Sequence, residues 1–268
     1  MFSSRSGTAT NESSVSRTGN LATQEGAAHH IAADPALRLR FPAGLTLKRL
    51  LQIIAVLVLL NCVTRFALYA VDYQVRDGIK ALCFLVHLDY ESSLPTWYST
   101  LALLFCTLLL AVIARSKYRA GDGYALHWLG LVLLFGTMSL DEIACVHELT
   151  STALQRRLQT GGVLSYAWII PGSIFVLIVG LTYLKFLRHL PTRTRKLFIL
   201  AGAVYFGGAL GMEALSGLFL TGGSGEMFGY IVVSTIEEAC EMTGVALLIY
   251  ALLDYLPALV PAIRVEFS

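Results

Sequence analysis

The feature that most constrains this chain is a series of six long apolar stretches separated by short polar segments. A transmembrane helix needs about 17–25 mostly apolar residues to cross the hydrocarbon core of a bilayer. The stretches of about this length run approximately over residues 50–71, 97–114, 125–145, 166–186, 197–220 and 228–252. Only 14% of the residues are charged, whereas soluble domains carry about 25%. The sequence therefore predicts an all-α, polytopic transmembrane bundle with six spanning helices, surrounded by membrane lipids.

Basic residues predict how the helices are oriented. They gather before the first stretch, after the second and after the fourth: Arg38, Arg40, Lys48, Arg49; Arg115, Lys117, Arg119; and Arg188, Arg193, Arg195, Lys196. In an alternating six-helix arrangement these three clusters lie on one side of the membrane. Lysine and arginine are enriched on the cytoplasmic side. We therefore expect both termini to be cytoplasmic.

The first part of the chain differs in composition from the rest. Residues 1–44 are rich in serine, threonine, glycine and alanine, and large apolar side chains are scarce there. Such a segment cannot bury enough apolar surface to offset the entropy lost on ordering. It also lacks the apolar core of a signal peptide. We expect a disordered cytoplasmic tail over residues 1–44, a transmembrane domain over 45–256, and a short cytoplasmic tail over 257–268.

Familiar enzyme and binding signatures are missing from the sequence. The net charge of +2 is too small to indicate a nucleic-acid partner. There is no P-loop, nucleophile elbow, dinucleotide fingerprint or CxxC pair. His147 and Glu148 lack the second histidine of an HExxH zinc motif. Glu142 is also wrongly spaced from His147 for the Glu-x-x-His pairs of di-iron carboxylate proteins.

Acidic residues inside the apolar stretches are the strongest functional signal. The sixth stretch contains Glu237, Glu238 and Glu241, and the fifth contains Glu213. The third ends in the run SLDEIACVHE, which brings Asp141, Glu142, His147 and Glu148. At a rise of about 1.5 Å per residue, Glu213 and Glu237 lie roughly 10 and 14 Å below the outer surface. Three helices therefore place acids in the outer half of the bilayer.

Helical angles indicate which of these side chains face the same way. At about 100° per residue, Glu237 and Glu241 lie about 40° apart on one face of their helix. Asp141 shares a face with Glu148, whereas His147 points about 120° away in a regular helix. His147 joins the acids only if the helix ends or bends near Cys145. Glu142 and Glu148 lie near a helix end, where acids more often face water.

An ionised acid at the centre of a membrane helix costs roughly 2.5–3.5 kcal/mol. These acids must therefore be protonated, paired, hydrated in a cavity or bound to a cation. Arg65, in the first stretch, is the available counter-ion, but one arginine cannot neutralise several acids. Glu91, just before the second stretch, is a further candidate that could close the same cavity.

The sequence contains the runs SLDEIACVHE, GGALGME and IEEACEMTG, with LDYESSLPTWYS before them. In these runs the chain resembles a family of uncharacterised bacterial six-helix integral membrane proteins. The resemblance implies a multi-pass protein of the bacterial inner membrane and brings no established activity.

Three functions fit these observations. The first is a cation or proton site in the outer half of the bilayer, formed by Glu213, Glu237, Glu238, Glu241 and Asp141 and related to transport. The second is an intramembrane enzyme for a lipid-like substrate, in which His147, Asp141 and the glutamates hold a divalent metal cation. The third is a non-catalytic scaffold or sensor whose acids only fix helix packing. Close packing is also the simplest interpretation of Gly207, Gly208, Gly211 and Gly217.

Overall fold

Every long apolar stretch forms a helix in the computed structural model, which describes residues 37–39, 41–70, 76–219, 224–259 and 263–265. Among these residues, six helical segments are long and apolar enough to cross a membrane, which confirms the predicted fold class. The segments are Ala43–Leu68, Leu94–Arg119, Ala125–Ala144, Ile169–His189, Thr192–Phe219 and Phe228–Ala258. The protein is therefore a multi-pass integral membrane protein.

Five of the spans are single helices. They are α2 (Ala43–Ala70), α4 (Leu94–Arg119), α5 (Ala125–Ala144), α7 (Ile169–His189) and α10 (Ser224–Tyr255), which a short turn, η5 (Leu256–Ala258), extends. The fifth span is composite: α8 (Thr192–Phe206), a π-helical turn η3 (Gly207–Met212), α9 (Glu213–Ser216) and η4 (Gly217–Phe219). Because a π-helical turn inserts extra backbone into a helix, it resets the direction of the side chains that follow.

The segments between the spans carry shorter elements. They are α3 (Arg76–Val86), α6 (Val146–Leu158) and the 3₁₀ turn η2 (Gly162–Leu164). Strands β1 (Leu37–Leu39) and β2 (Ile263–Val265) pair in a two-stranded sheet. Contacts divide the chain into a small unit of its two ends and a helical unit, Arg40–Ile263, which contains every helix named above. Most of the predicted 1–44 tail lies outside the described residues.

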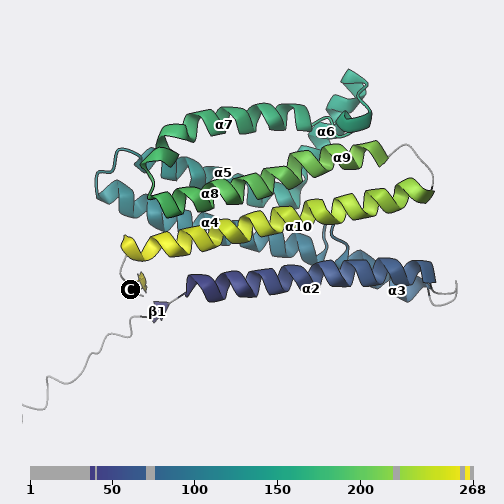
Figure 1. Cartoon of the computed structure of the whole chain (residues 1–268), viewed down its shortest axis with the longest axis horizontal. Helices are drawn as coiled ribbons and strands as arrows, with labels where there is room; N and C mark the ends of the chain where they lie inside the picture. Colours follow the sequence, from purple (N-terminus) through teal and green to yellow (C-terminus); the bar gives the residue numbers. More distant parts are fainter. Residues whose placement is uncertain (1–36, 40, 71–75, 220–223, 260–262, 266–268) are drawn as a thin grey trace, which may run out of the picture. The chain divides into compact units, whose positions relative to one another are not determined.

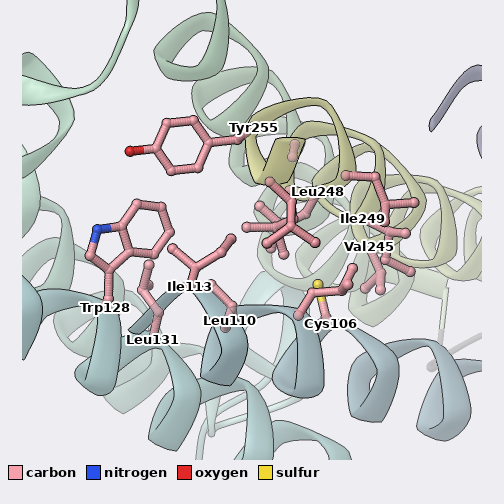
Figure 2. Close-up of a cluster of buried hydrophobic side chains, with 14 of the residues drawn as sticks. Cys106, Leu110, Ile113, Trp128, Leu131, Val245, Leu248, Ile249 and Tyr255 are labelled. Carbon is pink, nitrogen blue, oxygen red and sulfur yellow. The ribbon is translucent and has the colours of Figure 1, made fainter. Parts of the chain in front are cut away.

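Within the helical unit, α10 is the central helix. It packs against α2, α4 and α8, and Figure 1 shows it between α2 and α8. The main core lies where α10 meets α4 and α5. Figure 2 shows Leu110, Trp128 and Ile249 in this core. All three are at most 1% exposed, so these three helices exclude solvent where they meet.

The basic ends of the helices meet at one end of the helical unit. Lys117 at the end of α4 pairs with Asp122 at 2.8 Å. Arg193 at the start of α8 pairs with Asp254 near the end of α10, also at 2.8 Å. The second pair joins the start of α8 to the end of α10, and Asp122 also lies 4.0 Å from Nε2 of His189 at the end of α7. These are segments that the sequence assigned to one side of the membrane. That this side is cytoplasmic stays a prediction.

Small residues bring α10 close to the fifth span. A Cβ atom on Gly208 would lie 2.8 Å from the backbone oxygen of Glu237, and one on Gly244 would lie 2.8 Å from the backbone nitrogen of Tyr205. A Cβ atom on Gly217 would lie 2.6 Å from the backbone oxygen of Gly162. A Cβ atom on Gly207 or Gly211 would meet nothing within 4 Å. The predicted glycine seam is therefore formed by only part of the expected set.

Candidate functional site

A cavity of about 570 Å³ opens among α5, α6, the segment before α7, the fifth span and α10. The acidic residues that line it are Asp89, Glu91, Asp141, Glu142, Glu213, Glu237, Glu238 and Glu241, and His147 also lines it. We call this space the acidic cavity. It brings together the predicted site residues of three helices, and Glu91 of the turn segment 87–93 joins them.

The α10 wall carries three of these acids. Tyr205 is a polar neighbour of Glu241, and Gly208 gives the Glu241 side chain the room to lie against the fifth span. Glu238 has Glu241 and Glu142 as electrostatic neighbours. Among the described residues, Glu238 has neither a hydrogen bond nor an ion pair. It therefore presents an unpartnered carboxylate to the cavity.

The α5 wall carries Glu142, for which the sequence favoured a water-facing position. The structure places it in the cavity wall, with Ser99 of α4 as a polar neighbour. Its electrostatic neighbours are Glu91 and Asp141. Glu142 therefore belongs with the glutamates of α10.

Asp141 and His147 meet because α5 ends between them. Cys145 adopts the left-handed conformation, with φ of 52°, so that a new helix, α6, begins at Val146. Nδ1 of His147 then lies 2.7 Å from Oδ2 of Asp141, and the backbone N–H of His147 donates to Oδ1 at 3.2 Å. This is the helix end on which the participation of His147 depended.

Glu213 is held from the segment before α7. The indole Nε1–H of Trp168 donates to Oε1 of Glu213 at 2.8 Å. The Trp168 ring also packs edge-on against His147, with the ring centroids 5.4 Å apart. A chain of contacts therefore joins Asp141 and His147 to Glu213 through one tryptophan.

Asp89 was missed as a site residue. The hydroxyl of Tyr230 donates to Oδ2 of Asp89 at 2.8 Å, and Tyr230 lies 3.3 Å from the hydroxyl of Tyr166. Asp89 keeps accessible surface toward the cavity, yet the surrounding protein desolvates it and raises the pKa of its carboxyl. Desolvation likewise raises the pKa of Tyr166. The sequence signal that could have identified Asp89 is its position two residues before Glu91, which was a candidate.

Arg65 lies elsewhere than expected. Its guanidinium contacts the imidazole of His87, a residue only 5% exposed. In the described part of the chain it forms no ion pair with Glu213, Glu237, Glu238 or Glu241. Arg65, the predicted counter-ion, therefore contacts the turn segment 87–93, where Asp89 is its electrostatic neighbour.

A comparison with protein families places this arrangement in context. The family described as Domain of unknown function (DUF8692) matches residues 50–256. The chain belongs to this family. No curated protein and no solved structure matches the chain. The DUF8692 match includes every residue of the acidic cavity as well as Arg65, and the family has no named activity, in agreement with the resemblance seen in the sequence.

In the described part of this DUF8692 protein, the acidic side chains are spread over the cavity wall and do not form a metal-ligand cluster. Within the described residues, no three His, Cys, Asp or Glu side chains come close enough together to ligate one ion. The side chain of Glu148, a further proposed ligand, is outside the described part. The cavity instead has carboxylates that face a shared space. This arrangement suits reversible binding of protons or of a cation that keeps its hydration shell.

Proposed function

We propose that this protein binds a cation or protons in the acidic cavity, in the outer half of the bilayer, as a step of transport. One observation carries the proposal. The described lining of the cavity contains acids from α5, α9, α10 and the turn segment 87–93, and it contains no lysine or arginine. Such a site can carry several negative charges, and its described lining has no lysine or arginine to neutralise them.

Carboxylates that share a low-dielectric space repel one another and lose hydration, so their ionised forms are disfavoured together. Bound protons or a bound cation remove the repulsion. Acids in this position are typical of ion pathways and proton relays in membrane proteins. The cavity is therefore stabilised by the species that it would carry.

The scaffold alternative makes a different demand. Structural acids need partners that they hold in place, and breaking a buried ion pair costs about 3–5 kcal/mol. Arg65 was the candidate partner, but its guanidinium lies against His87. The metalloenzyme alternative needs a ligand cluster that the described residues do not provide. Both observations favour the cation or proton site.

The test is proton exchange by the purified protein in a weakly buffered detergent solution after a pH jump. The double variant Glu237→Gln/Glu241→Gln keeps the side-chain shape and removes the repelling charges. We expect it to exchange fewer protons than wild type and to unfold at the same temperature or a higher one. Asp254→Asn is the matched control, because Asp254 pairs with Arg193 at the basic end. Unchanged proton exchange with a lower unfolding temperature would instead support the structural role.

A further inference from the structure

The acidic cavity is much larger than a proton or a single metal ion requires. Its volume is about 570 Å³, whereas one water occupies about 30 Å³. Pockets for small organic ligands span about 300–1,000 Å³. The size therefore matches an organic molecule, and the acidic lining requires that molecule to be positively charged.

Aromatic rings form much of the wall between the acids. Those in the lining are Tyr90, Tyr166, Trp168, Phe175, Tyr205, Phe206 and Tyr230. The hydrogen bond from Trp168 to Glu213 holds ring and carboxylate together on one side of the cavity, and Tyr205 lies beside Glu241 on another. An organic cation is attracted to the faces of such rings, best to tryptophan, and to the carboxylates beside them.

Apolar side chains complete the lining. Leu134 and Met138 come from α5, Val176 from α7 and Leu210 from the π-helical turn. A hydrated metal ion gains nothing from such a surface, whereas the hydrocarbon part of an amine is stabilised by it. The mixture of acid, ring and aliphatic surface thus fits a ligand with a cationic head and an apolar body.

Glu237 and Glu238 line the cavity with neither a hydrogen bond nor an ion pair among the described residues, whereas Glu213 accepts from Trp168. Of the two, Glu238 has acids of both α10 and α5, Glu241 and Glu142, as electrostatic neighbours. We propose that the acidic cavity binds an organic ammonium ion, with Glu238 pairing with the nitrogen and Trp168 packing against the substituents. This inference rests on the proposed cation site and names the class of cation.

The test is isothermal titration of the full-length protein in lipid nanodiscs at pH 7. The probes are benzylamine and butylamine, and the neutral controls are benzyl alcohol and butanol, which have almost the same shape. We expect each amine to bind on the order of tenfold more tightly than its alcohol, a difference of about 1.4 kcal/mol. Equal binding of amines and alcohols would overturn the proposal.

Variants locate the site. Glu238→Gln should abolish the preference for the amine, and Asp254→Asn at the basic end should leave it intact. Trp168→Leu should weaken amine binding by about tenfold, whereas Trp168→Phe, which keeps a ring but loses the donor to Glu213, should weaken it less. Equal losses for the two Trp168 variants would remove the ring from the proposal.

A labelling experiment on the wild-type protein covers the case in which a variant fails to fold. A hydrophobic carbodiimide modifies accessible carboxyl groups, and mass spectrometry maps the site. N,N-Dimethylbenzylamine, a tertiary amine that cannot form an amide with a carbodiimide-activated carboxyl group, should protect Glu238 from modification, and benzyl alcohol should not. If amines neither bind nor protect while Glu237→Gln/Glu241→Gln still reduces proton exchange, the ammonium proposal fails and the proton site stands. If proton exchange is also unchanged, both fail.

Discussion

Nδ1 of His147 lies 2.7 Å from Oδ2 of Asp141, although the two residues belong to different helices. In one continuous helix they would point about 120° apart. The left-handed turn at Cys145 brings them together, and the second oxygen of Asp141 accepts the backbone N–H of His147 at the start of α6. One carboxylate thereby caps a helix and orients an imidazole at the edge of the acidic cavity.

The first prediction concerns the turn at Cys145. A non-glycine residue in a strained backbone region costs on the order of 1–3 kcal/mol, most for a β-branched side chain. Cys145→Val should therefore lower the free energy of unfolding by about that amount relative to Cys145→Ala. Cys145→Gly should lower it less than Cys145→Val, because glycine adopts a positive φ without strain, which offsets the cost of about 0.4–1 kcal/mol from its greater freedom in the unfolded chain. Denaturant titration in mixed micelles measures both. Cys62→Val is the control because Cys62 lies exposed on regular α2, and equal effects at the two positions would contradict the argument.

The second prediction concerns the contact between α10 and the fifth span. A Cβ atom on residue 244 would lie 2.7 Å from Cβ, 2.8 Å from N and 2.9 Å from Cα of Tyr205. Backbone atoms cannot rotate away, so Gly244→Ala should cost about 1–3 kcal/mol of unfolding free energy. Because Tyr205 contacts Glu241, this variant should also change proton exchange.

Gly202→Ala is the matched control for the glycine prediction. Gly202 lies in α8, and a Cβ atom there would meet nothing within 4 Å. Replacing a helical glycine by alanine at such a position should stabilise the helix by about 0.8–1.0 kcal/mol. The same loss of stability at both positions would indicate that helix propensity, and not the approach to Tyr205, determines the effect.

Much of the fold could be predicted because it depends on one property, the length of apolar sequence. The six spans follow directly from the cost of exposing backbone and charge to hydrocarbon. Convergence of Glu213 with Glu237 could be anticipated in the same way, since depth follows from residue counting. Hydropathy gives depth but little about angle. The π-helical turn just before Glu213 is therefore a feature that counting at 100° per residue does not contain.

Partners across segments could not be predicted, because they are tertiary contacts. The sequence offered Arg65 one obvious role, as counter-ion to the glutamates, but a turn segment brought His87 against it instead. Asp89 was overlooked for the same reason, since its place in the site comes from Tyr230, far along the chain. For His147, the sequence allowed only a conditional prediction, that it joins the acids if the helix ends or bends near Cys145. The left-handed backbone at Cys145 meets that condition.

The third prediction is topological. The basic clusters after α4 and α7 lie at the same end of the helical unit as the end of α10, since Lys117 lies over the ring of Tyr255 and Arg193 pairs with Asp254. Reporter fusions after Ser268 and within residues 188–196 should therefore both give a cytoplasmic signal. A fusion within residues 159–165 is the control and should give an external signal. An external signal from either of the first two would contradict the orientation and place the acidic cavity in the inner half of the bilayer.

The fourth prediction is a pH dependence of stability at His87. Burial, and then the neighbouring Arg65 guanidinium, lower the pKa of His87 from 6.5 to about 4. The backbone N–H of Asp89 also donates to its Nδ1 atom at 3.1 Å, which favours the neutral ring. Between pH 6.5 and about 4 the unfolded chain therefore binds a proton at this position that the folded protein does not. The free energy of unfolding should fall as the pH is lowered through this window, by about 3 kcal/mol in total.

His87→Gln isolates this contribution, because glutamine keeps a polar side chain beside Arg65 and does not titrate. The difference in unfolding free energy between wild type and variant, measured at closely spaced pH values, should be constant above pH 6.5 and change steadily below it. Asp89 acts in the opposite sense: desolvation raises its pKa, so its contribution to stability is present at low pH and is lost as the pH rises. That contribution is common to both proteins and largely cancels in the difference. A difference that stayed flat from pH 7 to pH 4 would contradict the prediction, because it would show that folding leaves the pKa of His87 unchanged.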